Sequence, residues 1–260
     1  MGSKKFRNKL CVYCARETSV TGDHVFAREF FLPNRRCNLP QVPTCGPCNN
    51  AKSKIEHYLT ALLPFGGRHT DALESLTTLV PKRLERNKKL QRHLATRRST
   101  VWSLENGVYR QAMTVPLEPG SIEQLFALIA KGLAWHHWRL YFTEEHTLEA
   151  MALTSFGEKF LQQNFFDLNV AQRVQVSLGE GTVQYEAVQG VDCSHITVWR
   201  FKVYGGLAMG GDPEAPNEVC NQIAVLTAPN RTFRMAELLS KFGAIPKEKA
   251  ADLFSSSQNK

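Results

Sequence analysis

The sequence has no long apolar run and no recognisable export signal. Nowhere in its 260 residues do about 18 apolar residues follow one another, so we expect no helix that crosses a membrane. The basic segment 1–7 leads into Cys11 without an apolar core, and its Gly2 and Phe6 do not fit a myristoylation motif. We therefore expect a cytoplasmic protein, in a compartment where paired cysteines hold metals more often than they form disulfides.

Internal repeats and a phosphate-binding loop are also missing. The glycine-rich stretch 205–211 has neither the lysine of such a loop nor an amphipathic helix after it, so we expect a hairpin loop there. In Trp135-His136-His137-Trp138 the two histidines are adjacent on an expected helix, where neighbouring side chains diverge by about 100° and cannot hold one metal together. Packed aromatic rings with exposed histidines are the expected arrangement.

Positive charge is present but unevenly placed. The net charge is +8, and two segments carry the excess: 1–60 has ten Lys and Arg against four Asp and Glu, and 82–98 has eight against Glu85 alone. The rest of the chain is therefore net negative. This asymmetry favours a polyanion bound at one end of the molecule. A solvated helix face with scattered surface lysines is the alternative, and it explains either segment better than it explains both.

Four of the seven cysteines form two Cys-x-x-Cys pairs, Cys11 with Cys14 and Cys45 with Cys48, separated by thirty residues. Four thiolates at this spacing suit one tetrahedral zinc, and a complete set of four protein ligands leaves no open position for a substrate. We therefore expect a structural zinc that cross-links a segment too small to bury a core of its own. Disulfide pairing is the alternative. The remaining cysteines are expected to be packing residues: Cys37, Cys193 and Cys220.

The pattern along the chain predicts an α+β protein. A small zinc-centred β-β-α module is expected at residues 1–65, and a larger domain of helices followed by antiparallel strands at 66–260. Pro64-Phe65-Gly66-Gly67 ends the first helix and marks the expected boundary. Helical apolar spacing and alternating β-branched or aromatic residues define the other elements. The expected helices are 49–63, 70–96 (broken near Pro81), 121–142 and 145–165, and the expected strands are 173–178, 183–188, 195–204 and 218–226.

Chemistry-bearing residues stand between and after the cysteine pairs: Asp23-His24, Asn38 and Asn49-Asn50-Ala51-Lys52. With this order and spacing, residues 8–58 resemble the HNH endonuclease family. Its ββα-metal (His-Me finger) motif has the pattern Cys-x-x-Cys, Asp-His, Asn, then Cys-x-x-Cys-Asn/His-x-x-Lys. The Gly-Gly that often stands between His and Asn in the family is absent, and this chain has segment 30–36 in its place. The resemblance covers less than a quarter of the chain.

The resemblance implies metal-dependent hydrolysis of DNA phosphodiester bonds, in a role such as restriction or anti-phage defence. His24 would be the general base that takes a proton from the attacking water, because an imidazole titrates near neutral pH. Asp23 and Asn49 would hold Mg²⁺ or Mn²⁺ through oxygen atoms, with Asn50 as the competing ligand. Asn38 would orient His24. One such site cuts one strand, so a double-strand cut would need two subunits or two encounters.

Nucleic-acid contacts are expected from basic residues in both positive segments. Lys52, one turn after Asn49, would contact a phosphate, whereas His57 is expected to be merely exposed. The other candidates for backbone contacts are Arg28, Arg35, Arg36, Arg86, Lys88, Lys89 and Arg92. Residues 66–260 fit no family pattern, and they would bind DNA, form a homodimer or respond to a regulatory partner. The alternative functions are a zinc module that binds nucleic acid without catalysis, and a nuclease that acts on RNA.

Overall fold

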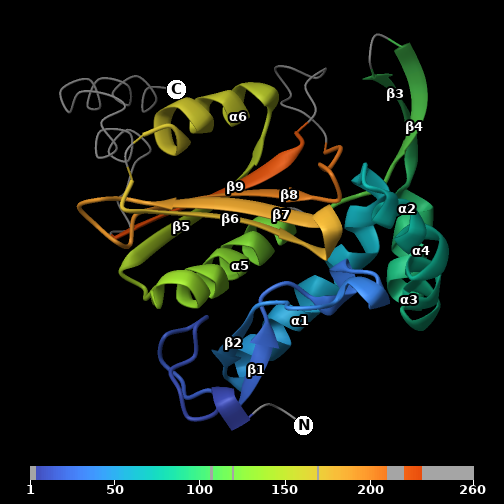
Figure 1. Ribbon diagram of the computed structural model, residues 1–260. Coiled ribbons are helices and arrows are strands. Elements are labelled where there is room, and N and C mark those ends of the chain that lie inside the picture. The colour runs from blue at the N-terminus through green and yellow to red at the C-terminus, as the bar shows by residue number, and fades with distance from the viewer. Residues whose placement is uncertain (1–3, 106–107, 119, 169, 210–219, 230–260) are drawn as a thin grey trace, which may run out of the picture.

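The protein is built from helices and antiparallel strands, so the predicted α+β class is confirmed. The computed structural model describes residues 4–105, 108–118, 120–168, 170–209 and 220–229 (Figure 1). Short 3₁₀ turns connect several of the longer elements: Lys4–Phe6, Arg28–Phe30, Pro33–Arg35, Leu63–Gly66 and Gly179–Gly181. Within the described ranges, no helix combines the length and the apolar character needed to cross a membrane.

The N-terminal part forms a module of two short strands and a helix. Strand β1 (Thr21–His24) pairs antiparallel with β2 (Gln41–Thr44), and helix α1 (Gly46–Leu62) starts directly after β2. Pro47 stands in the first turn of α1, where its missing N–H would have had no helical partner. The helix expected at 49–63 is therefore confirmed, with a start three residues earlier.

A five-stranded antiparallel sheet forms the other half of the molecule. Its strands lie side by side in the order β5-β9-β8-β7-β6. The four strands expected from alternation are confirmed within a few residues: β6 (Gln172–Leu178), β7 (Val183–Gln189), β8 (Thr197–Val203) and β9 (Gln222–Pro229). The loop expected at 205–211 lies partly outside the described residues.

The fifth strand corrects an expectation. The sequence pattern predicts a helix at 145–165, but β5 (His146–Leu153) pairs with β9 along its whole length at the edge of the sheet. The helix α6 (Ser155–Leu161) begins only after Thr154, whose side chain accepts a hydrogen bond from the N–H of Gly157 at 3.3 Å. A π-helical turn, Gln162–Phe166, continues it. Pairing with a distant strand decided the structure of this segment, and local residue preference did not.

The helix expected at 70–96 is broken near Pro81, as predicted, and once more at Asn87, so that it forms three short helices. They are α2 (Thr70–Thr78), α3 (Val80–Arg86) and α4 (Lys88–Arg97). Asn87 ends α3 and caps α4 by accepting a hydrogen bond from the N–H of Leu90 at 3.0 Å. Strands β3 (Ser99–Glu105) and β4 (Val108–Thr114) then pair as a separate ribbon that the sequence did not reveal.

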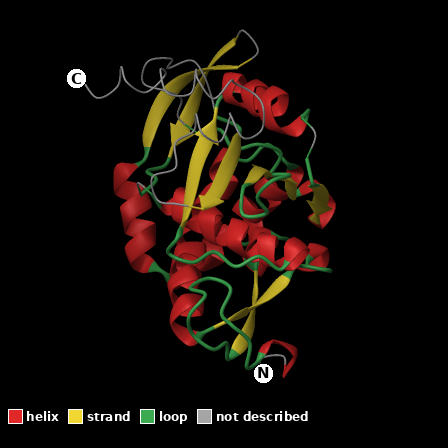
Figure 2. Ribbon diagram, turned by 90° about the vertical axis from the view of Figure 1, so that its left-hand side faces the viewer, coloured by secondary structure: helices red, strands yellow, loops and turns green. Residues whose placement is uncertain are grey.

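The sheet is covered on both faces, and the module lies beyond one of these covers. Helix α5 (Ser121–Trp138) packs on one face and α6 on the other (Figure 1), and the view in Figure 2 also places the β1–β2 hairpin at the N-terminal end of the molecule, away from the sheet. Module and sheet share one hydrophobic core. The ring of Phe26 lies 5.8 Å from that of Tyr185 and 6.4 Å from that of Phe201. Position 65 is therefore not a boundary between separate cores.

Candidate functional site

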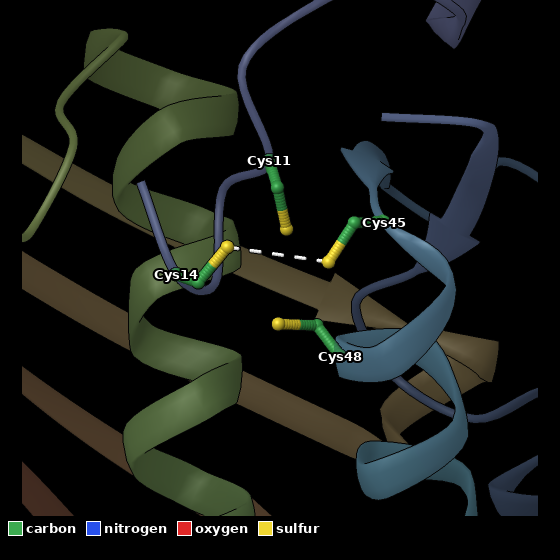
Figure 3. A group of neighbouring side chains, drawn as sticks. All are labelled: Cys11, Cys14, Cys45 and Cys48. Carbon is green, nitrogen blue, oxygen red and sulfur yellow. Dashed lines mark hydrogen bonds between the residues drawn. The ribbon is translucent and has the colours of Figure 1, made fainter. Parts of the chain in front are cut away.

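The four paired cysteines meet at one point, as their spacing predicts. Cys11 and Cys14 come from the loop before β1, and Cys45 and Cys48 from the junction of β2 and α1, and all four sulfur atoms point towards a common centre (Figure 3). Their Sγ atoms all lie within 4.8 Å of one another, and those of Cys14 and Cys45 are 4.0 Å apart. A tetrahedral zinc with bonds of about 2.3 Å needs sulfur atoms about 3.8 Å apart. This group, which we call the four-cysteine site, therefore fits a metal such as zinc.

The surroundings of the four-cysteine site favour thiolate formation unequally. Burial raises the pKa of the Cys11 thiol, but hydrogen bonds from backbone N–H groups, that of Cys45 first, outweigh it and bring the pKa to about 7. Burial also raises the pKa of Cys48, so a metal must displace its proton. Lys131 of α5 lies near these sulfurs, where its Nζ donates to the carbonyl of Tyr13 at 3.1 Å. The positive charge of Lys131 would offset part of the negative charge of four thiolates.

Asp23 points from β1 towards α1 and is held by two donors. The Tyr13 hydroxyl donates to Asp23 Oδ2 at 2.6 Å, and Lys52 Nζ lies 3.0 Å from the same oxygen. The ammonium of Lys52 also donates to the carbonyl of His24 at 2.8 Å and pairs with Glu56, one turn further along α1. All three ammonium protons therefore have an acceptor. We call Tyr13, Asp23, Lys52 and Glu56 the buried cluster.

The position of Lys52 corrects its expected role. The sequence pattern predicts a phosphate contact at the surface, but the side chain of Lys52 is only 1% exposed. A buried ammonium requires opposite charges beside it, and Asp23 and Glu56 supply them. The i, i+4 spacing of Lys52 and Glu56 is the sequence signal that would have shown this pairing. Glu56 and Tyr13 are the members of the buried cluster that the sequence analysis missed.

Burial tunes the protonation of the buried cluster. Burial raises the pKa of the Glu56 carboxyl from 4.5 to about 7, and attraction to Lys52 offsets only part of this rise. Burial and the neighbouring charge of Asp23 raise the pKa of Tyr13 well above its ordinary value. The phenol thus remains a neutral hydrogen-bond donor to Asp23 at neutral pH.

His24 turns to the other face of β1, because successive side chains of a strand alternate. It is half-buried and lies opposite Gln41 on β2, with 2.7 Å between the His24 and Gln41 Nε2 atoms. Burial lowers the pKa of the imidazole, and the charge of Asp23 opposes this only in part. The ring is therefore neutral near pH 7. The expectation that Asn38 orients His24 is corrected, since Asn38 is exposed with φ at 56° and Gln41 makes that contact.

The structure separates the two candidate asparagines of α1. Asn49 is half-buried and stands three residues before Lys52, so both lie on the side of α1 that faces Asp23. Asn50 is exposed and points about 100° away around the helix. Asn49 is therefore the one that shares a side with the Asp23 carboxylate. His57 is exposed, as expected.

The arginines expected to contact a backbone differ in availability. Arg28 is exposed, and its charge is felt at His24, whose pKa it helps to lower. Arg35 instead lies 3.4 Å from Asp71 and pairs with Glu180, while Arg36 donates from Nε to the carbonyl of Phe31 at 3.2 Å. Arg35 therefore ties its loop to distant parts of the chain through two carboxylates, which corrects its expected role as a contact to a nucleic-acid backbone, whereas Arg36 bonds only within its own loop and stays a candidate.

The second positive segment is largely exposed and lies far from the four-cysteine site. Helices α3 and α4 pack on the C-terminal half of α1, where Leu62 meets Leu90 and Leu94. That end of the 17-residue α1 is roughly 25 Å from the four-cysteine site. The four candidates for backbone contacts in this segment are all exposed: Arg86, Lys88, Lys89 and Arg92. Arg83 of the same segment turns inward and donates to the carbonyls of Thr60 and Glu29 at 2.6 and 2.7 Å.

Comparisons with protein-family models, with curated proteins and with solved structures find no match to this chain. The candidate site consists of the four-cysteine site, a neutral half-buried imidazole, and a carboxylate and an amide on facing elements.

Proposed function

We propose that this protein is a metal-dependent endonuclease of the HNH type that hydrolyses phosphodiester bonds in DNA. One observation carries the proposal. The four-cysteine site joins a β1–β2 hairpin to the start of α1, and this unit presents Asp23 and His24 from β1 and Asn49 from the first turn of α1. A base, a carboxylate and an amide held by one rigid unit are what hydrolysis of a phosphodiester needs.

His24 serves as the general base. Its burial-lowered pKa keeps the ring neutral and able to accept a proton from water. Gln41 lies at Nε2, and its terminal amide can turn by about 180°. When it offers Oε1, the His24 Nε2–H donates to it and the lone pair lies on Nδ1, which then takes the proton. Gln41 is thus a positioning residue for the base.

Asp23 and Asn49 are the proposed protein ligands of a divalent ion. Lys52 and Tyr13 both contact Oδ2 of Asp23, which leaves Oδ1 for such an ion. Carboxylate and amide oxygens suit Mg²⁺ or Mn²⁺, and this ion, when bound, would stabilise negative charge on the scissile phosphate. Lys52 fixes the direction of the Asp23 carboxylate. The four-cysteine site is proposed to hold zinc in a structural role.

A plasmid-nicking assay with Mg²⁺ and with Mn²⁺ tests this function. We expect the wild-type protein to convert supercoiled DNA to the open circle, and His24→Ala to be slower by about 10²-fold or more, as for loss of a general base. His57→Ala is the matched control, because His57 is an exposed histidine on α1. Equal inactivity of wild type and His24→Ala under every metal would rule the proposal out. Parallel RNA substrates decide between DNA and RNA.

One observation favours the second candidate, a zinc module that binds nucleic acid without catalysis. The ammonium of Lys52 already neutralises the Asp23 carboxylate that a divalent ion would use. Under this alternative the protein shifts DNA on a gel but cuts under no metal, and His24→Ala changes neither result.

A further inference from the structure

A cavity beside His24 lies between the N-terminal segment, the loop into β2 and the end of α5. Its volume is about 630 Å³, within the range of roughly 300–1,000 Å³ that is usual for ligand sites. Gln41 lines this cavity, and the amide of the same residue contacts Nε2 of His24 at 2.7 Å. Gln41 therefore stands between the cavity and His24, and it places the cavity next to the proposed general base.

The charge of this cavity is positive. Lys5, Lys9 and Arg139 line it, and no acidic side chain is among the lining residues that the structure describes. Burial lowers the pKa of His136, and the positive charges of Arg139 and Lys5 lower it further. Both cations therefore lie near His136 on the same wall of the cavity. Such a cavity selects an anion, and phosphate is the anion that the neighbouring site would hydrolyse.

Aromatic rings form the remaining wall and fix one of the cations. The Arg139 guanidinium lies 4.4 Å from the ring centre of Trp135 and donates to the carbonyl of Trp135 at 3.1 Å. The indole N–H of Trp135 donates to the Tyr141 hydroxyl at 2.9 Å. Tyr141 is half-buried and lines the cavity beside Trp135. Aromatic and guanidinium planes are the surfaces on which unpaired bases stack.

We propose that this cavity binds one unpaired nucleotide of the strand that is cut, next to the scissile phosphate. Lys5, Lys9 and Arg139 contact its phosphates, and its base stacks against Tyr141. A base can stack on Tyr141 only when it is unpaired, so the protein should prefer single-stranded or unpaired DNA over a perfect duplex. This proposal rests on the proposed function for the identity of the strand, but the binding is testable without cleavage.

The test is fluorescence anisotropy with a labelled single-stranded oligonucleotide and with the same sequence as a duplex, in EDTA to prevent cleavage. We expect Arg139→Gln and Tyr141→Ala each to weaken single-strand binding by about fivefold or more. The double variant Lys5→Gln/Lys9→Gln should also flatten the dependence of log affinity on log salt by about 1.4. Arg16→Gln is the matched control, since Arg16 is an exposed arginine paired with Glu144 and does not line the cavity. Unchanged thermal midpoints exclude misfolding, and Arg139→Lys replaces any variant that fails this check.

Each outcome decides the proposal. Loss of single-strand affinity in the cavity variants, with Arg16→Gln unaffected, supports it even if no cleavage is found, and in that case only the proposed function fails. If the protein cleaves DNA but the cavity variants bind the single strand as tightly as Arg16→Gln does, the cavity proposal is overturned and the proposed nuclease function stands. Tighter binding of the duplex than of the single strand overturns it as well. The proposal is also overturned if binding of an octaglutamate peptide depends on Arg139 and binding of the oligonucleotide does not. The cavity would then bind an acidic protein.

Discussion

The β1–β2–α1 module and the five-stranded sheet are held together in different ways. The sheet is filled by apolar side chains such as Trp199 and Phe201, which are fully buried under α5. The module has at its centre the four-cysteine site and the buried cluster, which are ligands and charges. Buried charge pairs add little net stability compared with apolar residues, but they lose much when one partner is removed. The buried cluster therefore fixes the direction of side chains more than it adds stability, whereas the four-cysteine site stabilises the module through the metal that it would bind.

Among the variants that test this difference between module and sheet, Cys45→Ser should destabilise the protein most. The free energy of binding a structural zinc is about 10 kcal/mol or more, and most of it contributes to folding. We expect loss of bound zinc by elemental analysis and a loss of roughly 5 kcal/mol or more in the free energy of unfolding. Cys37→Ser is the control, because Cys37 is an exposed free cysteine outside the four-cysteine site. One zinc per chain retained by Cys45→Ser, with unchanged stability, would contradict a structural metal at these four residues.

The next largest effect is expected from Lys52→Met, which keeps the bulk of the side chain and removes its charge. Asp23 and Glu56 would then face each other without the ammonium that lies between them. Removing one partner of a buried ion pair costs about 3–5 kcal/mol, measurable by urea unfolding. Lys54→Met on the exposed side of the same helix should change stability by less than about 0.5 kcal/mol. Equal stability of the two variants would mean that Lys52 is not needed to offset the buried carboxylates.

Glu56 makes the stability of the module depend on pH. Its pKa is about 7 in the folded protein against 4.5 as the ordinary value, so the folded state retains a proton that the unfolded state releases between these limits. The stabilising contribution of Glu56 is therefore complete below pH 4.5 and is lost as the pH rises through about 7. We expect the wild type to lose up to about 3 kcal/mol relative to Glu56→Gln between pH 5 and pH 8. Urea titrations at both pH values measure this difference, and parallel curves for the two proteins would show that Glu56 titrates normally.

The structure of the module was largely predictable from the sequence because the patterns that define it are local. Two Cys-x-x-Cys pairs define the metal ligands, and apolar spacing defines α1. The direction of side chains was not readable. In the sequence Lys52 and Arg35 resemble surface cations. In the structure each lies beside a carboxylate that is distant along the chain, Asp23 for Lys52 and Asp71 for Arg35. Likewise Gln41, and not Asn38, reaches His24, because the register of β1 with β2 decides which residue lies opposite.

In the sheet, the balance between local and distant information is reversed. The central strands β7 and β8 were predictable, since both alternate with β-branched and aromatic residues. The edge strand β5 was mistaken for a helix because its sequence, with Glu149 and Ala150 in the middle, has no strong strand preference of its own. Pairing with β9, more than sixty residues away along the chain, supplies what local sequence does not. Contacts across such a distance leave no pattern in a short window of residues.

The smallest and most specific effect concerns the contact that joins the two regions. A Cβ atom added to Gly132 in α5 would lie only 2.9 Å from Cγ2 of Val25, the residue after His24. Alanine in a helix is favoured over glycine by about 1 kcal/mol, but here the clash must move Val25, so we expect Gly132→Ala to be net destabilising by about 1 kcal/mol. Val25→Ala removes the methyl groups in the way, and the double variant should recover the helical gain, so a double-mutant cycle in urea gives a positive coupling. Gly46→Ala is the control, since its added Cβ meets nothing within 4 Å. If Gly132→Ala stabilises the protein as much as Gly46→Ala does, then α5 does not hold Val25, and through it His24, by close packing.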